Sequence, residues 1–288
     1  MKHLFTKLLT LLLIVSSSFF STAKNNDNNF VIDHSEIVTI DSKVLKRKYD
    51  LYIKVPRDYF LEDSKYKKYP VLYLNDGPHT FKVASGVTHF SQMDKAIVVG
   101  ISFAHGEQGQ HSRVRDLTPV VDETWKKYRT GGAPLYLDFI ENEVIKYVEN
   151  NYRVNSKQRI LSGHSLGGSF GAWVLLTKPE LFSSYILTSP SLWFKKYWIF
   201  DLEEQYKSKN KHLNANLYFA TGSLETIKDG MYYEMADDQV KFMNKLVSRN
   251  YQGLTVKSEV VEGTDHHSTF PVGLSKGLMF VYNQMNLL

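Results

Sequence analysis

The sequence predicts an α/β fold, with a mostly parallel, doubly wound sheet of about eight strands flanked by helices. Three observations indicate this fold. Short and nearly continuous apolar runs recur along the chain, amphipathic segments separate them, and a glycine-rich turn joins one central run to the next helical segment. Continuous apolar strands are typical of a sheet that is covered on both faces. Alternation of strands and helices favours parallel pairing.

The expected strands and helices follow from hydrophobic periodicity. Residues 36–40 and 48–55 alternate between apolar and polar side chains, which predicts an antiparallel opening pair. Further strands are expected at the apolar runs 71–74, 96–103, 159–162, 184–188, 216–220 and 255–261. Helical spacing of apolar residues predicts helices over 133–150, 169–176, 231–249 and 271–286.

The chain has 288 residues, of which 43% are hydrophobic, and it contains no cysteine. This length and composition predict one large folded domain, which we place at 36–288 after a polar leader at 24–35. The lack of cysteine excludes disulfides, thiolate catalysis and cysteine-based metal sites.

The first 23 residues have the pattern of a secretory signal peptide. Lys2 and Lys7 precede a short apolar run at 8–20, and small residues follow it up to Ala23. We therefore expect cleavage after Ala23 and a secreted or periplasmic protein. The run has about 13 residues, fewer than the roughly 20 that span a bilayer, so no membrane span is expected after removal. The alternatives are an uncleaved anchor and a misread strand.

Charge and motifs make several partners improbable. The net charge is +5, or +3 without Lys2 and Lys7, which is too small an excess to indicate nucleic acid. The histidines at positions 79, 89, 105 and 111 share no ligand spacing, and no nucleotide-binding glycine loop occurs. We expect neither a metal nor another cofactor.

The pattern Gly163-x-Ser165-x-Gly167 lies between a predicted strand and a predicted helix. In this context it predicts a nucleophile turn, in which a strained serine is pushed into the open. The strand and the helix would then pass so closely that only small residues fit two positions to either side. Ser165 is therefore the candidate nucleophile. The alternative is an ordinary glycine-rich turn.

A serine hydroxyl needs a base to take its proton, and such turns place an acid and then a histidine after the last two strands. Glu225 follows the strand at 216–220, with Asp229 as the competing acid. Two adjacent histidines, His266 and His267, follow the strand at 255–261, and one of them is the expected base.

Backbone amides should stabilise the oxyanion of the tetrahedral intermediate. The amide of Leu166, directly after the candidate nucleophile, is one expected donor. The second should come from the loop that follows the strand at 71–74. Because Pro78 has no amide hydrogen, this donor is expected to be Gly77 or, as the alternative, His79.

Five segments together resemble the esterase D-like family of α/β-hydrolases, in particular its branch of ferric-siderophore (enterobactin and bacillibactin) esterases. They are VLYLNDG at 71–77, RDLTP at 115–119, GHSLGG at 163–168, SPSLW at 189–193 and DHHS at 265–268. The resemblance implies an α/β-hydrolase fold and ester hydrolysis by Ser165 and His266. His267 departs from the small residue that the family has after its catalytic histidine.

Candidate substrate contacts are His164, Arg115 and Trp193. The segment 189–209 is rich in aromatic residues and includes Lys195 and Lys196, so it could form a wall for an aromatic or anionic ester. It could equally be a helix whose aromatic side chains pack in the core. Arg115 could equally form an ion pair with a nearby carboxylate.

We therefore expect an exported serine carboxylic ester hydrolase that works through an acyl-enzyme, with a siderophore lactone as the candidate substrate. The alternatives are a carbohydrate-ester (acetyl or feruloyl) esterase, a general acyl hydrolase, and a non-catalytic binding protein on the same fold.

Overall fold

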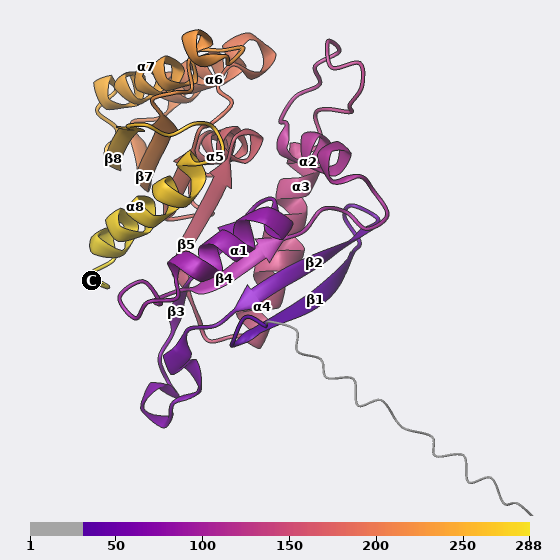
Figure 1. The fold of residues 1–288 in the computed structure, drawn as a ribbon, viewed down its shortest axis with the longest axis vertical. Helices are drawn as coiled ribbons and strands as arrows, with labels where there is room; N and C mark the ends of the chain where they lie inside the picture. Colours follow the sequence, from indigo (N-terminus) through magenta and orange to yellow (C-terminus); the bar gives the residue numbers. More distant parts are fainter. Residues whose placement is uncertain (1–30) are drawn as a thin grey trace, which may run out of the picture. The chain divides into compact units, whose positions relative to one another are not determined.

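An eight-stranded sheet runs through the computed structural model, which describes residues 31–288 (Figure 1). The predicted signal peptide and most of the predicted leader lie outside the described residues. The strand order is β1-β2-β4-β3-β5-β6-β7-β8. β1, β2 and β4 pair antiparallel, and the remaining neighbours pair in parallel. The predicted mostly parallel sheet of about eight strands is thus confirmed.

The strands are longer or shorter than the apolar runs by a few residues. They are β1 Ser35–Ser42, β2 Arg47–Lys54, β3 Tyr69–Leu74, β4 Ile97–Ile101, β5 Val154–His164, β6 Ser184–Thr188, β7 His212–Gly222 and β8 Gln252–Val261. Every residue of β3, β4 and β6 is buried, because helices cover both faces of the sheet there.

Helices cover the sheet in two layers (Figure 1). α1 (Gly77–Val87) and α8 (Thr269–Gln284) pack against each other and against one face. The layer on the other face consists of α2 Gly109–Leu117, α3 Ala133–Phe139, α4 Ile145–Asn151, α5 Leu166–Thr177, α6 Phe194–Lys209 and α7 Met235–Ser248. Each layer has its own apolar cluster, and the sheet separates the two.

Two of the predicted helices differ in detail. The helix expected over 133–150 contains a π-helical turn at Ile140–Val144, between α3 and α4. The helix expected over 231–249 begins only at Met235, because Glu234 has a ψ of 69° and the residues before it turn away. α1 and α2 were not predicted as helices, whereas α6 agrees with the helix that was one of the two alternatives for the segment 189–209.

The carboxyl ends of the parallel strands lie along one edge of the sheet, where α/β folds bind their ligands. The register aligns Leu74 of β3 with Ser162 of β5, and His164 of β5 with Thr188 of β6. It also aligns Gly222 of β7 with Val261 of β8. The loops that carry the sequence candidates therefore start side by side.

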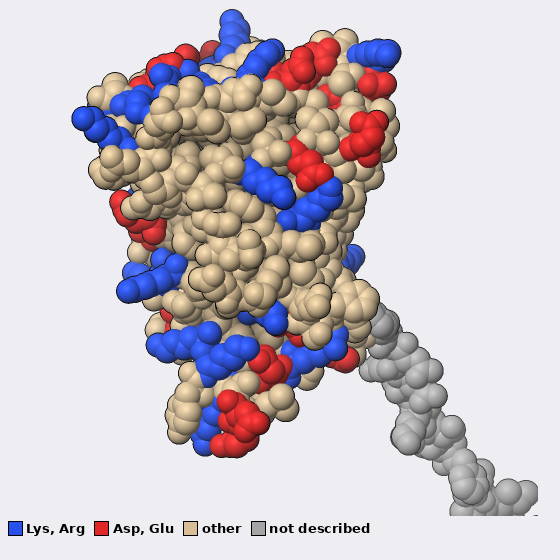
Figure 2. Space-filling model, turned by 90° about the vertical axis from the view of Figure 1, so that its left-hand side faces the viewer, with Lys and Arg blue, Asp and Glu red and all other residues tan. Residues whose placement is uncertain are grey.

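Charged side chains of both signs are scattered over the face shown in Figure 2. Positive and negative side chains adjoin at several places, with uncharged surface between these groups, so this face carries no continuous basic stripe. Within residues 31–288, no helix is both long and apolar enough to cross a membrane.

Candidate active site

Ser165 stands between β5 and α5 in a backbone conformation that is rare for residues with a side chain, with φ 59° and ψ −118°. Its amide donates a hydrogen bond to the carbonyl oxygen of Thr188 at 3.0 Å, which ties the turn to β6. Strain of this kind costs about 1–3 kcal/mol and is typical of functional turns. The surrounding sheet and helix hold the turn in place.

The glycines around Ser165 differ in how closely they are packed. A Cβ atom on Gly163 would overlap the carbonyl oxygen of Gly167, and one on Gly168 would lie 2.9 Å from Cα of Pro190. At Gly167 a Cβ atom would be 3.5 Å from its nearest neighbour, an ordinary contact. The expectation that close packing requires a small residue on both sides is therefore wrong at position 167. The tight positions are 163 and 168.

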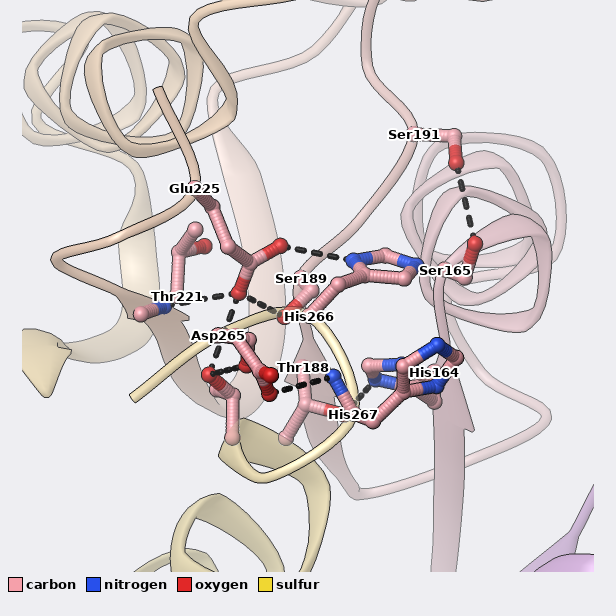
Figure 3. A network of polar contacts seen from close by, with 12 residues as sticks. His164, Ser165, Thr188, Ser189, Ser191, Thr221, Glu225, Asp265, His266 and His267 are labelled. Carbon is pink, nitrogen blue, oxygen red and sulfur yellow. Dashed lines mark hydrogen bonds and ion pairs between the residues drawn. The ribbon is translucent and has the colours of Figure 1, made fainter. Parts of the chain in front are cut away.

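Glu225 and His266 form a hydrogen bond between the loops after β7 and β8 (Figure 3). Nδ1 of His266 lies 2.7 Å from Oε2 of Glu225. The other carboxylate oxygen, Oε1, accepts hydrogen bonds from the hydroxyl of Ser189 at 2.6 Å and from the amide of Gly222 at 2.8 Å. A carboxylate accepts from Nδ1–H, so this arrangement leaves Nε2 of the imidazole free to accept a proton.

The surroundings of Glu225 favour its ionised form although its side chain is fully buried. Burial alone would raise the pKa of this carboxyl. The hydrogen bonds from His266, Ser189 and Gly222 outweigh burial and lower the pKa below its ordinary value. The site therefore holds a fixed negative charge behind the imidazole.

The free edge of the His266 ring points toward the side chain of Ser165 (Figure 3). The Ser165 hydroxyl lies 3.4 Å from the hydroxyl of Ser191, whose amide in turn donates to the carbonyl oxygen of Ser165 at 3.1 Å. Without a substrate, catalytic hydrogen bonds in such sites are often long. The structure thus brings Ser165, His266 and Glu225 together in one row.

The two competing candidates lie outside this row. The carboxylate of Asp229 accepts a hydrogen bond from the hydroxyl of Thr226 at 2.6 Å in an exposed turn. His267 packs edge-on against the His266 ring, and its backbone amide donates to Asp265 at 3.0 Å.

His164 packs directly against the proposed base. Its ring centroid is 4.6 Å from that of His266 and 5.6 Å from that of Phe270. Nδ1 lies 3.0 Å from the hydroxyl of Thr188. Burial lowers the pKa of His164 to about 3, and the neighbouring His266 and Arg113 contribute to the decrease. His164 is therefore a neutral ring in the wall of the site at physiological pH.

The candidate oxyanion donors are the first residues of two helices. Leu166 begins α5 and Gly77 begins α1, so the amides of both lack an acceptor within their own helix. The two helix starts lie close together, since a Cβ atom on Gly167 would contact the side chains of Asn75 and Asp76. The alternative donor, the amide of His79, already donates to the carbonyl oxygen of Asp76 at 2.9 Å.

Trp193 lines a cleft of about 390 Å³. In the chain it stands two residues after Ser191, whose hydroxyl lies next to that of Ser165. Its indole stacks on Tyr233 with a centroid distance of 4.1 Å and an interplanar angle of 5°, and Trp125 lies nearly parallel at 6.1 Å. Two lysines and two carboxylates also line the cleft, namely Lys195, Lys196, Asp122 and Glu123, and Lys195 lies 3.8 Å from Asp122. Residues 195–197 have positive φ values, which turn the start of α6 out of the normal helical path.

Arg115 is occupied elsewhere. Its guanidinium forms ion pairs with Asp116, at 2.8 Å, and with Glu107. The hydroxyl of Tyr49 lies 3.2 Å from the same group. These contacts favour the alternative of a structural ion pair over a substrate contact.

Several residues of the site escaped the sequence analysis. Ser189 and Gly222 hold Glu225, and Trp125 and Tyr233 build the aromatic stack. Only Ser189 had a signal, since it begins the segment SPSLW. Among the described residues, no group of three His, Asp or Glu side chains is arranged to hold a metal ion.

Comparisons with known proteins place the chain in a family of esterases. Residues 42–281 match the family described as "Esterase: Putative esterase". The chain is 28% identical to the ferri-bacillibactin esterase BesA of Bacillus subtilis, over 88% of this chain and 91% of that protein. It is 27% identical to the siderophore triacetylfusarinine C esterase of Aspergillus fumigatus, over 74% of this chain and 81% of that protein.

Solved structures give the same result. The BES protein from Bacillus cereus superposes with a TM-score of 0.75 at 27% identity, covering 88% of this chain and 96% of that one. An IroE-like serine hydrolase from Shewanella oneidensis gives 0.74 at 28% identity, covering 85% and 78%. The α/β-hydrolase fold and the resemblance to siderophore esterases are therefore confirmed. The chain belongs to the esterase family, and it is a serine esterase.

Proposed function

We propose that Ser165, His266 and Glu225 form the catalytic triad of a carboxylic ester hydrolase. The observation that supports this most strongly is the 2.7 Å hydrogen bond between His266 and Glu225 beside the strained Ser165 turn. A buried carboxylate that fixes the tautomer of an imidazole is the arrangement that activates a serine hydroxyl.

The proposed reaction proceeds through an acyl-enzyme. Nε2 of His266 takes the proton of Ser165 as its hydroxyl oxygen attacks the ester carbonyl. The amides of Leu166 and Gly77 stabilise the oxyanion, and His266 then protonates the departing alcohol. Water, deprotonated by the same imidazole, attacks the acyl-enzyme, and the acid leaves as Ser165 recovers its proton.

We further propose that the substrate is a siderophore ester. The named relatives are esterases of ferri-bacillibactin and of triacetylfusarinine C, which supports this substrate class. The cleft beside Trp193 offers a flat aromatic wall, and its two lysines are balanced by Asp122 and Glu123, so its surface suits an aromatic group. The N-terminal pattern of residues 1–23 supports export to the periplasm or the medium as part of this proposal.

A fluorophosphonate probe tests the catalytic proposal. We expect the protein to be labelled at Ser165, with mass spectrometry locating the adduct, and we expect Ser165→Ala to abolish both labelling and hydrolysis of p-nitrophenyl acetate. Ser191→Ala is the matched variant, since it removes the neighbouring hydroxyl but leaves the proposed nucleophile. An unlabelled protein, or labelling at another residue, would exclude this assignment.

Adjacent tyrosines test the role of the cleft. Tyr233 lines the cleft, whereas Tyr232 is 92% exposed and is not among its lining residues. We expect Trp193→Ala and Tyr233→Ala to lower kcat/KM for ferri-bacillibactin by up to about tenfold, because each removes stacking worth about 0.5–1.5 kcal/mol. Tyr232→Ala should stay within twofold, and all three variants should hydrolyse triacetin normally. A wild-type protein that prefers feruloyl or acetyl sugars would refute the siderophore assignment.

A further inference from the structure

Asp76 has an unusual place at the turn between β3 and α1. Its φ of 58° and ψ of 40° are left-handed, a conformation that residues with a Cβ atom rarely adopt. Asp76 is also the N-cap residue of α1, yet its carboxylate makes no hydrogen bond to the amides of that helix. Something other than ordinary capping therefore holds this side chain.

Arg113 of α2 holds the carboxylate of Asp76 with both arms of its guanidinium. Nε lies 2.9 Å from Oδ1, and Nη2 lies 2.9 Å from Oδ2. The side chains are only 16% and 8% exposed, so water screens the pair weakly. The Asp76 charge raises the pKa of Arg113 in spite of its burial, which by itself would lower it. Two parallel bonds of this kind fix orientation as well as distance.

The pair lies where the two proposed oxyanion amides meet. Gly77, directly after Asp76, fits so closely against β4 that a Cβ atom on it would lie 2.7 Å from the carbonyl oxygen of Ile101. On the other side, a Cβ atom on Gly167 would lie 3.7 Å from Oδ2 of Asp76, so the carboxylate sits against the first turn of α5. That turn begins with Leu166.

We propose that the Arg113–Asp76 pair positions the oxyanion amides and neutralises the negative charge beside them. This inference rests on the proposed function, in which the amides of Gly77 and Leu166 stabilise the tetrahedral intermediate. The two hydrogen bonds from Arg113 keep Asp76 in its left-handed conformation. This conformation sets the direction of the next peptide, which carries the Gly77 amide. Both residues are positioning residues that act through that amide.

The charge of the pair matters as much as its shape. Without Arg113, the carboxylate of Asp76 beside the two helix starts would repel the oxyanion that forms during the reaction. Repulsion between like charges is strong where water is excluded. The guanidinium cancels this charge. Its field also extends into the site, since Arg113, after burial and His266, contributes to the lowered pKa of His164.

Variants that replace a charged side chain of the pair by a neutral one separate this role from a merely structural one. We expect Arg113→Gln, measured per active site titrated with the fluorophosphonate, to lower kcat about 10–100-fold with KM within threefold. The loss should be smaller than the 10²–10³-fold loss of a whole oxyanion donor, because the amides remain. Adding Asp76→Asn to Arg113→Gln should restore kcat at least fivefold, since it removes the unbalanced carboxylate. A purely structural pair would lower the melting temperature in both cases without this rescue.

Arg159→Gln is the matched control, because Arg159 forms a similar half-buried pair with Glu149 at 2.6 Å and exposures of 19% and 28%. We expect its kcat to stay within twofold of the wild type. If Arg113→Gln fails to fold, Arg113→Lys is the second variant. It keeps the positive charge but cannot make the two parallel hydrogen bonds, and it should lower kcat about 3–10-fold. An Arg113 variant with wild-type kcat, or a double variant without rescue, would overturn the inference. A wild-type protein that does not label at Ser165 would instead overturn the proposed function.

Discussion

Replacing Glu225 with glutamine gives the sharpest test of the triad, because the surroundings dictate how the new amide must lie. Oε1 of Glu225 accepts from the amide of Gly222, which can only donate. The amide oxygen of the glutamine must therefore take the Oε1 position, and its NH2 group must face Nδ1 of His266, 2.7 Å away in the wild type. The variant thus presents a donor where the imidazole needs an acceptor.

This reversal forces His266 into the wrong tautomer. Nδ1 would lose its proton and accept from the glutamine, and Nε2 would carry the proton instead of taking it from Ser165. Restoring the reactive tautomer gives up the neutral hydrogen bond from the glutamine, worth about 0.5–1.5 kcal/mol, and leaves two N–H donors facing each other at a further cost of about 1–3 kcal/mol. The imidazolium that forms also loses its charge-assisted bond to the carboxylate, worth about 1.5–3 kcal/mol. Together these amount to about 4–5 kcal/mol, or a 10³–10⁴-fold lower kcat.

Initial rates of p-nitrophenyl acetate hydrolysis measure the effect, and circular dichroism checks that the variant is folded. Asp229→Asn is the matched control, since this carboxylate lies in the same loop but contacts Thr226, and its kcat should stay within twofold. A folded Glu225→Gln protein whose kcat lies within tenfold of the wild type would refute the tautomer argument.

Two further predictions concern stability. Unfolded His164 takes up a proton below about pH 6.5, whereas folded His164 does so only near pH 3. The free energy of unfolding should therefore fall as the pH is lowered through this range, by at most about 1.4 kcal/mol per pH unit. Urea titrations of His164→Asn should show a shallower fall with pH than those of the wild type. An equal slope for the two proteins would contradict the burial of a neutral His164 ring. Gly163→Ala should unfold the protein or lower its melting temperature by more than 10 °C, because its Cβ overlaps Gly167, while Gly167→Ala should shift it by less than about 4 °C. Thermal melts that rank the two alanine variants the other way would show that the turn can shift to accommodate the methyl group.

The sequence was most informative where a short run of neighbouring residues determines the local backbone conformation. The run of apolar residues before Gly163 and the helix after Ser165 made the turn predictable, and strand ends with polar loops pointed to Glu225 and His266. These signals are local or follow from the strand order. The structure places the three side chains in one row because parallel strands align their carboxyl ends.

Contacts between distant segments had no such signal. Asp76 and Arg113 are 37 positions apart, and neither residue type nor spacing indicates that their side chains meet. The left-handed residues 195–197 are likewise invisible in the sequence, because their Lys and Tyr side chains would fit an ordinary helix. Both features depend on tertiary packing, which overrides local preference.

The register of β7 and β8 explains why the acid and the histidine meet although their loops differ in length and composition. The two strands pair in parallel up to Gly222 and Val261, so both loops leave the sheet at the same height. A Cβ atom on Gly222 would overlap the carbonyl oxygen of Thr264, which shows that the loops touch through their backbones. The distance between Glu225 and His266 is thus set by the sheet and by backbone contact. Side chains on the outer parts of these loops can then vary without moving the pair.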